Sequence, residues 1–321
     1  MERTERQANK RNHHFVPKFY LKGFTDSDSP SKLWVYTRGR DFDQGDRTHT
    51  WNPYKSSIGK AGMGRDFYAC KDVHGKVDYN TFENELEKKE KPADKLIRKI
   101  CGFQPLNENE KEALSLYMTM MHQRIPKRFE NLRANLPDLI REEKDGLLNQ
   151  YEGANGNENT SRGMIEKAID YLSKNPDEIL LRSMLEGMPI SRRAMTSMRW
   201  QYFVPPIGDY FVTSDCPLFH FENLGLDHSR AEFVFPISSK VAIVGSWYMG
   251  LPEVICHISS EVVQEINRRT CVNAHNFVYA KVACKRIYDL MQDHNGQLPL
   301  LYNHIIPNAG LPLVPKWVSN N

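Results

Sequence analysis

Two predicted helices carry charged side chains on faces that are otherwise apolar. Glu83 and Glu90 share one face of the first helix, because residues three and four positions apart lie on the same side. Arg124 takes a similar position on the second helix, with Gln123 beside it. A buried carboxylate is costly unless a cation or several donors reach it, and arginine can bind both carboxylate oxygens. We therefore expect Arg124 to pair with Glu83 or Glu90, either as a structural ion pair or inside a ligand pocket.

Two adjacent histidines, His13 and His14, stand where the polar start of the chain gives way to an apolar stretch. Neighbouring side chains of an extended segment point in opposite directions, so one histidine of the two can face a shared site. That histidine could serve as a general base or as a metal ligand. The alternative is a packed histidine that hydrogen-bonds to the backbone and fixes the entry of the chain.

A carboxylate follows a predicted strand in the segment from Val212 to Pro217, where Ser214 and Asp215 stand next to Cys216. Loops held by strands often carry catalytic or metal-binding residues, which makes Asp215 a candidate. The same carboxylate could instead accept hydrogen bonds from nearby amides in an Asx-type turn. The sequence leaves both interpretations open.

Two Cys-x-x-x-His pairs, Cys216 with His220 and Cys271 with His275, could supply four ligands to a zinc ion. This spacing is weak evidence, because the fold can separate the two pairs. The six cysteines form no Cys-x-x-Cys motif and are scattered along the chain. We expect them to be free and mostly buried thiols.

The elements that must position these residues have the order strands, helices, strands. Asn107 and Glu110 form a capping-box pattern that starts one of the helices. The predicted helices are a short one from Pro17 to Gly23 and longer ones at 79–101, 107–126, 128–148, 162–174, 176–199 and 259–274. The predicted strands are 33–36, 66–69, 201–204, 210–213, 233–235, 241–244 and 277–280.

This order predicts an α+β fold, in which β-rich N- and C-terminal parts form a sheet around a central helical block at about 79–199. We expect a disordered N-terminus at 1–12, a single domain at 13–300 and a C-terminal coil at 301–321. The segment 151–162 has the composition of a linker.

The composition of the 321 residues limits the class of protein. The chain has 43 basic and 40 acidic residues and a net charge of +3, which is not typical of a dedicated nucleic-acid binder. No apolar run reaches the roughly 18 residues that span a bilayer, and the N-terminus lacks the apolar core of a signal peptide. We therefore expect a cytoplasmic protein with no membrane partner.

Several of these stretches together resemble the bacterial family named domain of unknown function 4238. The resemblance covers residues 13 to 282 and includes Cys216 at a position where the family usually has Asn. The resemblance rests on the following residues: the run His13 to Pro17, Glu83 and Glu90, the run Gln123 to Pro126, the turn from Ser214 to Pro217, and Asn267. It supports grouping the polar members of this set into one candidate site.

The mixture of histidine, carboxylate, glutamine and arginine favours a hydrolase, a nuclease or phosphodiesterase of a bacterial defence or toxin type, with a divalent metal as its candidate cofactor. Two alternatives stay open: a non-catalytic module that binds nucleic acid, a nucleotide or another phosphorylated ligand, and a structural or partner-binding protein. The assigned roles are catalytic for His13, His14, Glu90 and Asp215, substrate-binding for Gln123, Arg124, Ser214 and Asn267, and structural pairing for Glu83.

Overall fold

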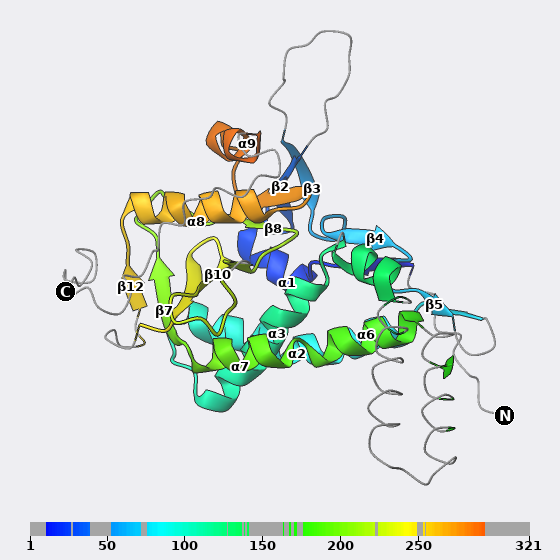
Figure 1. Cartoon of the computed structure of the whole chain (residues 1–321). Coiled ribbons are helices and arrows are strands. Elements are labelled where there is room, and N and C mark those ends of the chain that lie inside the picture. Colours follow the sequence, from blue (N-terminus) through cyan, green and yellow to red (C-terminus); the bar gives the residue numbers. More distant parts are fainter. Residues whose placement is uncertain are drawn as a thin grey trace, which may run out of the picture.

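The structure, a computed structural model, describes residues 11–26, 28–38, 53–71, 76–126, 128–136, 176–221, 224–248 and 255–292, with a few isolated positions between these ranges. Its helices are α1 (Lys18–Leu21), the 3-10 turn η1 (Lys22–Phe24), α2 (Thr81–Cys101), α3 (Glu108–Gln123), α6 (Pro176–Glu186), α7 (Pro189–Ser197), α8 (Ser260–Asn273) and α9 (Lys285–Gln292). Its strands are β1 (Asn12–His14), β2 (Lys32–Thr37), β3 (Tyr54–Ser57), β4 (Met63–Arg65), β5 (Cys70–Lys71), β6 (Val77–Asp78), β7 (Arg199–Val204), β8 (Thr213–Ser214), β9 (Phe219–His220), β10 (Glu232–Ser238), β11 (Val241–Ser246), β12 (Ile255–His257) and β13 (Phe277–Ala280). Figure 1 shows their arrangement.

Strands from both ends of the chain share one sheet. The four-stranded sheet has the order β3-β2-β13-β8, and Val278 of β13 lies between Tyr36 of β2 and Ser214 of β8. A five-stranded sheet with the order β12-β7-β11-β10-β9 is built from the C-terminal part alone. Helices α2, α3, α6 and α7 come between the two groups of strands in the sequence. The predicted α+β class, with a central helical block, is confirmed.

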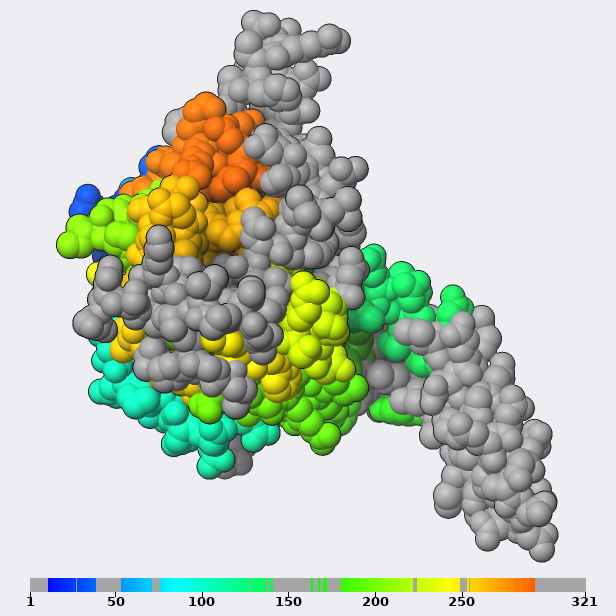
Figure 2. Space-filling model, turned by 60° about the vertical axis from the view of Figure 1, so that its left-hand side comes forward, coloured from blue at the N-terminus to red at the C-terminus, as the bar shows by residue number. Residues whose placement is uncertain are grey.

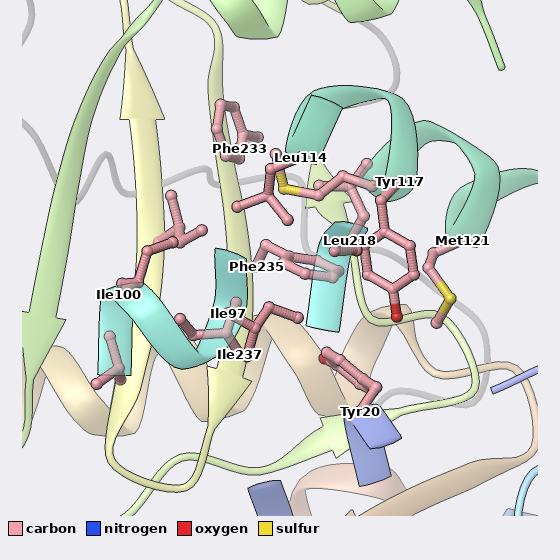
Figure 3. Close-up of a cluster of buried hydrophobic side chains, with 14 of the residues drawn as sticks. Tyr20, Ile97, Ile100, Leu114, Tyr117, Met121, Leu218, Phe233, Phe235 and Ile237 are labelled. Carbon is pink, nitrogen blue, oxygen red and sulfur yellow. The ribbon is translucent and has the colours of Figure 1, made fainter. Parts of the chain in front are cut away.

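The five-stranded sheet lies between two layers of helix. Along β10, Phe233 and Phe235 belong to the core that contains Leu114 and Tyr117 of α3, whereas Val234 packs in a second core with Val263 of α8. This alternation follows from the pleat of a strand, which sends successive side chains to opposite faces. Helix α8 accordingly lies across the sheet from the helical block (Figure 1), and the close-up shows side chains of α2, α3 and β10 pointing toward one another (Figure 3).

A turn replaces the strand that the sequence predicts at 66–69. Strand β4 ends at Arg65, and Asp66 takes a left-handed backbone conformation with φ of 56°. Aspartate tolerates this conformation, and its carboxylate is held by Arg11 at 2.9 Å from Nε. The turn sends Tyr68 into the interior, where its side chain is 1% exposed. The prediction was wrong because the composition of the run Phe67 to Ala69 is typical of a strand, whereas the left-handed backbone at Asp66 begins a turn.

The predicted helix at 176–199 is two helices. Gly187 ends α6 with φ of +68°, and Pro189 begins α7, where a missing N–H costs nothing. A side chain at Gly187 would lie 2.6 Å from the Thr119 hydroxyl oxygen, so the close contact with α3 also requires glycine.

The remaining differences are local. Of the predicted strand 210–213, the structure places only Thr213 in a strand. The elements that were not predicted are the helix α9 and the short strands β1, β3, β4, β5, β6, β9 and β12. The capping box at Asn107 and Glu110 is confirmed. The linker at 151–162, the helix at 162–174, the segment 1–10 and the coil at 301–321 fall wholly or mainly outside the described residues, whereas Arg11 and Asn12 are described. All six cysteines lie outside disulfide bonds, and three of them are buried.

Candidate functional site

Arg124 is the hub of the predicted polar cluster. It is the C-cap of α3, and only 2% of its surface is exposed. Its Nε donates to the Tyr68 hydroxyl at 2.7 Å, one Nη donates to a Glu90 carboxylate oxygen, and the other donates to the backbone carbonyl of His14. The guanidinium also lies over the Tyr68 ring, 5.6 Å from its centroid. Of the two carboxylates that the sequence proposed as partners, the structure pairs Arg124 with Glu90.

These contacts join four segments that are far apart in the sequence: β1, the turn after β4, α2 and α3. Burial by itself lowers the pKa of Arg124, but Tyr68 and Glu90 raise it, and the net shift is upward. The arginine therefore stays charged although it is fully enclosed. Because each contact comes from a different segment, the cluster fixes the N-terminal strand against the helical block.

Both ring nitrogens of His13 form hydrogen bonds with backbone groups. The backbone N–H of Tyr68 donates to Nδ1 at 2.8 Å, so Nδ1 is an acceptor. The proton of the neutral ring therefore lies on Nε2, which donates to the carbonyl oxygen of Tyr79 at 2.9 Å. The ring stacks on Tyr68 with 5.5 Å between centroids. These contacts leave His13 no free lone pair, as in the interpretation of a packed histidine that fixes the chain.

His14 points to the opposite side of β1 and has a different environment. Its ring is buried, at 8% exposure, and its Nε2 makes no hydrogen bond within the part of the chain that the structure describes. Burial lowers the pKa of His14 to about 4, and the charges of Lys18 and Arg124 lower it further, while the backbone carbonyls of Gly59 and Ile58 act in the opposite direction. His14 is therefore a neutral imidazole in a positive field.

Asp215 is held by three backbone amides. Its Oδ1 accepts from His275 N–H at 2.8 Å, and its Oδ2 accepts from Asn276 N–H at 2.6 Å and from Phe277 N–H at 3.1 Å. Burial raises its pKa to about 6, and these amides oppose the shift. The carboxylate thereby shapes the turn that leads into β13. Next to it, the Ser214 hydroxyl accepts from the N–H of Cys216 at 3.1 Å.

Asn267 of α8 holds the segment before β8. Its side-chain oxygen accepts from Val212 N–H at 2.9 Å, and its side-chain nitrogen donates to the Tyr210 carbonyl at 2.9 Å. Glu83 lies on α2, and its charge raises the pKa of Tyr68, a contact of the Arg124 cluster. Gln123 precedes Arg124, and its Oε1 is buried with no hydrogen-bond partner within the described ranges.

By their direct hydrogen-bond partners, the predicted site residues fall into three groups. The first surrounds Arg124 with Glu90 and the two histidines, the second is the Asp215 turn with Ser214, and the third is the Asn267 clamp. The profile of the family described as Protein of unknown function (DUF4238) matches residues 12–283.

This chain belongs to that family. Comparison with curated proteins and with solved structures gives no match. The matched region begins at β1 and ends just before α9, so it includes all three groups of polar residues. Within the described ranges, no helix has both the length and the apolar character needed to cross a membrane.

The turn that resembles the family's Ser-Asp motif contains Cys216, whose Sγ accepts from the side-chain amide of Asn273 at 3.0 Å. Cys271 packs in a hydrophobic core with Val278 of β13. Among the described residues, no group of three or more His, Cys, Asp or Glu side chains is placed to hold a metal ion. The four zinc ligands suggested by the Cys-x-x-x-His spacing are thus not such a group.

Several buried polar residues are not among the predicted site residues. Lys111 is 5% exposed and donates to Glu253 at 2.6 Å and to the Met198 carbonyl at 2.7 Å. Arg269 is 1% exposed and paired with Glu232. Tyr117 has a buried hydroxyl without a hydrogen-bond partner in the described region. Its spacing of seven from Arg124 places both residues on one face of α3.

Proposed function

We propose that this protein binds a phosphorylated ligand at His14 and hydrolyses it, with His14 as general base. One observation carries the proposal: the buried Nε2 of His14 has no hydrogen-bond partner within the described ranges. Buried polar atoms are nearly always hydrogen-bonded, and a catalytic role or a bound ion is among the explanations of an exception. A neutral imidazole with an available Nε2 can accept the proton of a water or hydroxyl nucleophile.

The surrounding charge supports an anionic ligand. The charges of Lys18 and Arg124 both disfavour the protonated ring of His14, which means that the ring lies in their field. A phosphate group entering this field would offset the two positive charges. The pKa of His14 would then rise from about 4 toward the range in which a histidine is an effective base.

The chemical step follows from these assignments. His14 Nε2 takes a proton from water, the water oxygen attacks phosphorus, and the bond from phosphorus to the leaving oxygen breaks. Arg124 contributes its charge from behind the site, because three of its donors already bind Tyr68, Glu90 and the His14 carbonyl. Glu90 and Asp215 act as positioning residues in this proposal, since their carboxylates are held by Arg124 and by backbone amides.

A second candidate, binding without hydrolysis, uses the same residues and differs in one respect. It needs the positive field at His14 but no proton transfer. The same observations of charge favour it, and the contacts around Arg124 serve both candidates equally. Loss of hydrolysis with retained binding in a His14 variant separates the two.

The test uses the full chain, its His14→Ala and Lys18→Ala variants, and His257→Ala as a control at an exposed histidine on β12. Binding of inorganic phosphate and nucleotides is followed by the ring signals of His14 in NMR titrations. Hydrolysis is measured on nucleotides, a phosphodiester dye, single-stranded DNA and RNA, with and without divalent metals. We expect phosphate to raise the pKa of His14 and His14→Ala to abolish turnover. Unchanged binding and turnover in both variants would refute the proposal.

A further inference from the structure

Two histidines from distant segments meet between α3 and β9. His122 lies in the last turn of α3, and His220 ends β9 on the side of the sheet that faces the helical block. Their Nε2 atoms are 3.4 Å apart, whereas their ring centroids are 4.9 Å apart, with 54° between the ring planes. Since the nitrogens are closer than the centroids, both rings direct Nε2 toward the gap between them.

The separation of the two nitrogens fits a shared metal ion better than a direct hydrogen bond. Hydrogen bonds from a nitrogen donor in proteins usually span about 2.7–3.2 Å, so 3.4 Å is long for one. Two imidazoles on a tetrahedral zinc ion, each with a bond of about 2.0–2.1 Å, place their nitrogens roughly 3.3–3.4 Å apart. The observed distance equals this value without any movement of the side chains.

The two rings differ in their access to solvent. His122 is 4% exposed, while His220 is half-buried, so an ion would enter from the side of His220. Burial holds the pKa of His122 well below its ordinary value, and the charges of Arg128 and His220 add to the shift. The ring is therefore neutral at physiological pH, which is the state in which imidazole binds a metal.

We propose that His122 and His220 form a binding site for a tetrahedral transition-metal ion, Zn²⁺ or Co²⁺. The described residues contain no third His, Cys, Asp or Glu side chain that completes such a group. Water or a small external ligand takes the other coordination positions, which gives the ion an open site. This pair is different from the Cys-x-x-x-His pairs of the sequence, because His220 meets His122 of the helical block. It does not depend on the proposed function of His14.

The experiment titrates untagged, metal-stripped full-length protein with Co²⁺ and follows the visible absorption of tetrahedral cobalt, with Zn²⁺ as competitor. The main variant is His220→Ala, since this side chain is only half-buried. His257→Ala is the matched control, because it removes an exposed histidine. Circular dichroism and thermal melting verify that each variant is folded.

We expect one Co²⁺ per chain, displacement by Zn²⁺, at least a ten-fold loss of affinity in His220→Ala, and no change in His257→Ala. His122→Ala, if folded, should show the same loss. Absence of saturable binding, or equal affinity in the natural protein and His220→Ala, would overturn the proposal.

Discussion

The molecule contains two buried arginine clusters that differ in what surrounds the charge. Arg124 binds one carboxylate, one phenol and one backbone carbonyl. Arg269 of α8 binds the carboxylates of Glu232 and Glu265, each at 3.0 Å. The guanidinium of Arg269 also lies 5.2 Å from the ring centroids of both Phe219 and Phe221.

The neighbours of each cluster show the more informative difference. Around Arg124, the electrostatic influence of the guanidinium reaches His14 and Tyr117, whose buried Nε2 and hydroxyl lack hydrogen-bond partners among the described residues. Around Arg269, carboxylates and aromatic rings enclose the charge. A buried ion pair by itself is thus weak evidence of a site, whereas buried polar atoms without a hydrogen-bond partner beside it point to a ligand.

In Figure 2 the helical block, in cyan to green, and helices α8 and α9, in gold to orange, lie toward opposite ends of the visible face.

The largest effect is expected at the enclosed cluster. Arg269→Ala leaves the carboxylate of Glu232, which is 1% exposed, buried without its cation. Removal of one partner of a buried pair costs about 3–5 kcal/mol, and we expect a loss of unfolding free energy in that range. Urea denaturation followed by circular dichroism measures it. A loss below about 1 kcal/mol would mean that the two clusters do not differ in the way described.

Arg124→Ala is expected to cost slightly less, about 3 kcal/mol. Three donor contacts disappear, but the Glu90 side chain is 16% exposed and can be hydrated. The same denaturation experiment measures the change, and Arg98→Ala, at an exposed ion pair of α2, is the matched control. Equal stability of Arg124→Ala and the control would contradict the positioning role of Arg124.

A pH titration tests the environment of His14 beside the Arg124 cluster. The pKa of His14 is about 4 in the folded chain and roughly 6.5 when unfolded, so the unfolded state binds more protons between these values. Stability should therefore fall as the pH decreases from about 6.5 to 4, and His14 should account for up to about 2 kcal/mol after allowance for solvent screening.

His14→Asn removes this titration, and the measurement is the unfolding free energy of both proteins across the same pH range. Their difference isolates His14 from other groups, including His122. Parallel curves would show that His14 keeps an ordinary pKa and would weaken the proposed function.

The smallest effect is expected at the start of α3. Asn107→Ala removes the side-chain oxygen that accepts from Glu110 N–H at 2.9 Å, and loss of such a cap costs about 1 kcal/mol. Thermal melting measures the change. The cost of losing this exposed contact is the reference for the costs at the two buried clusters. A cost as large as that of Arg124→Ala would mean that the buried Arg124 contacts stabilise the fold no more than an exposed helix cap does.

The sequence predicted those features that depend on local spacing. The helical faces of α2 and α3 placed Glu90 and Arg124 toward one interior, and the capping pattern located the start of α3. The pairing of Arg124 with a glutamate followed from the cost of burying either charge alone. The prediction failed where a local pattern has two solutions, as at 66–69, where a left-handed Asp66 converts an apparent strand into a turn.

The candidate site could be predicted only as a set of residues. His13, Asp215 and Asn267 are polar and buried, as the sequence suggested, but their hydrogen-bond partners are backbone groups. A sequence does not show whether a polar side chain will meet a backbone amide or an open cavity, because that depends on how distant segments approach each other. The same reason explains why the His122 and His220 pair was missed.

The sequence by itself determined the helical block, the strands on both sides of it, the resemblance to its family and the requirement that Arg124 find an anion. Only the tertiary structure decided which anion that is, which of two adjacent histidines is held by the backbone, and which polar atoms remain open. Local propensity and periodicity act over a few residues and can be read from spacing. Which polar atoms find hydrogen-bond partners is decided between segments far apart in the sequence, such as Arg124 and the His14 carbonyl at a separation of 110 positions, and only once the chain is folded.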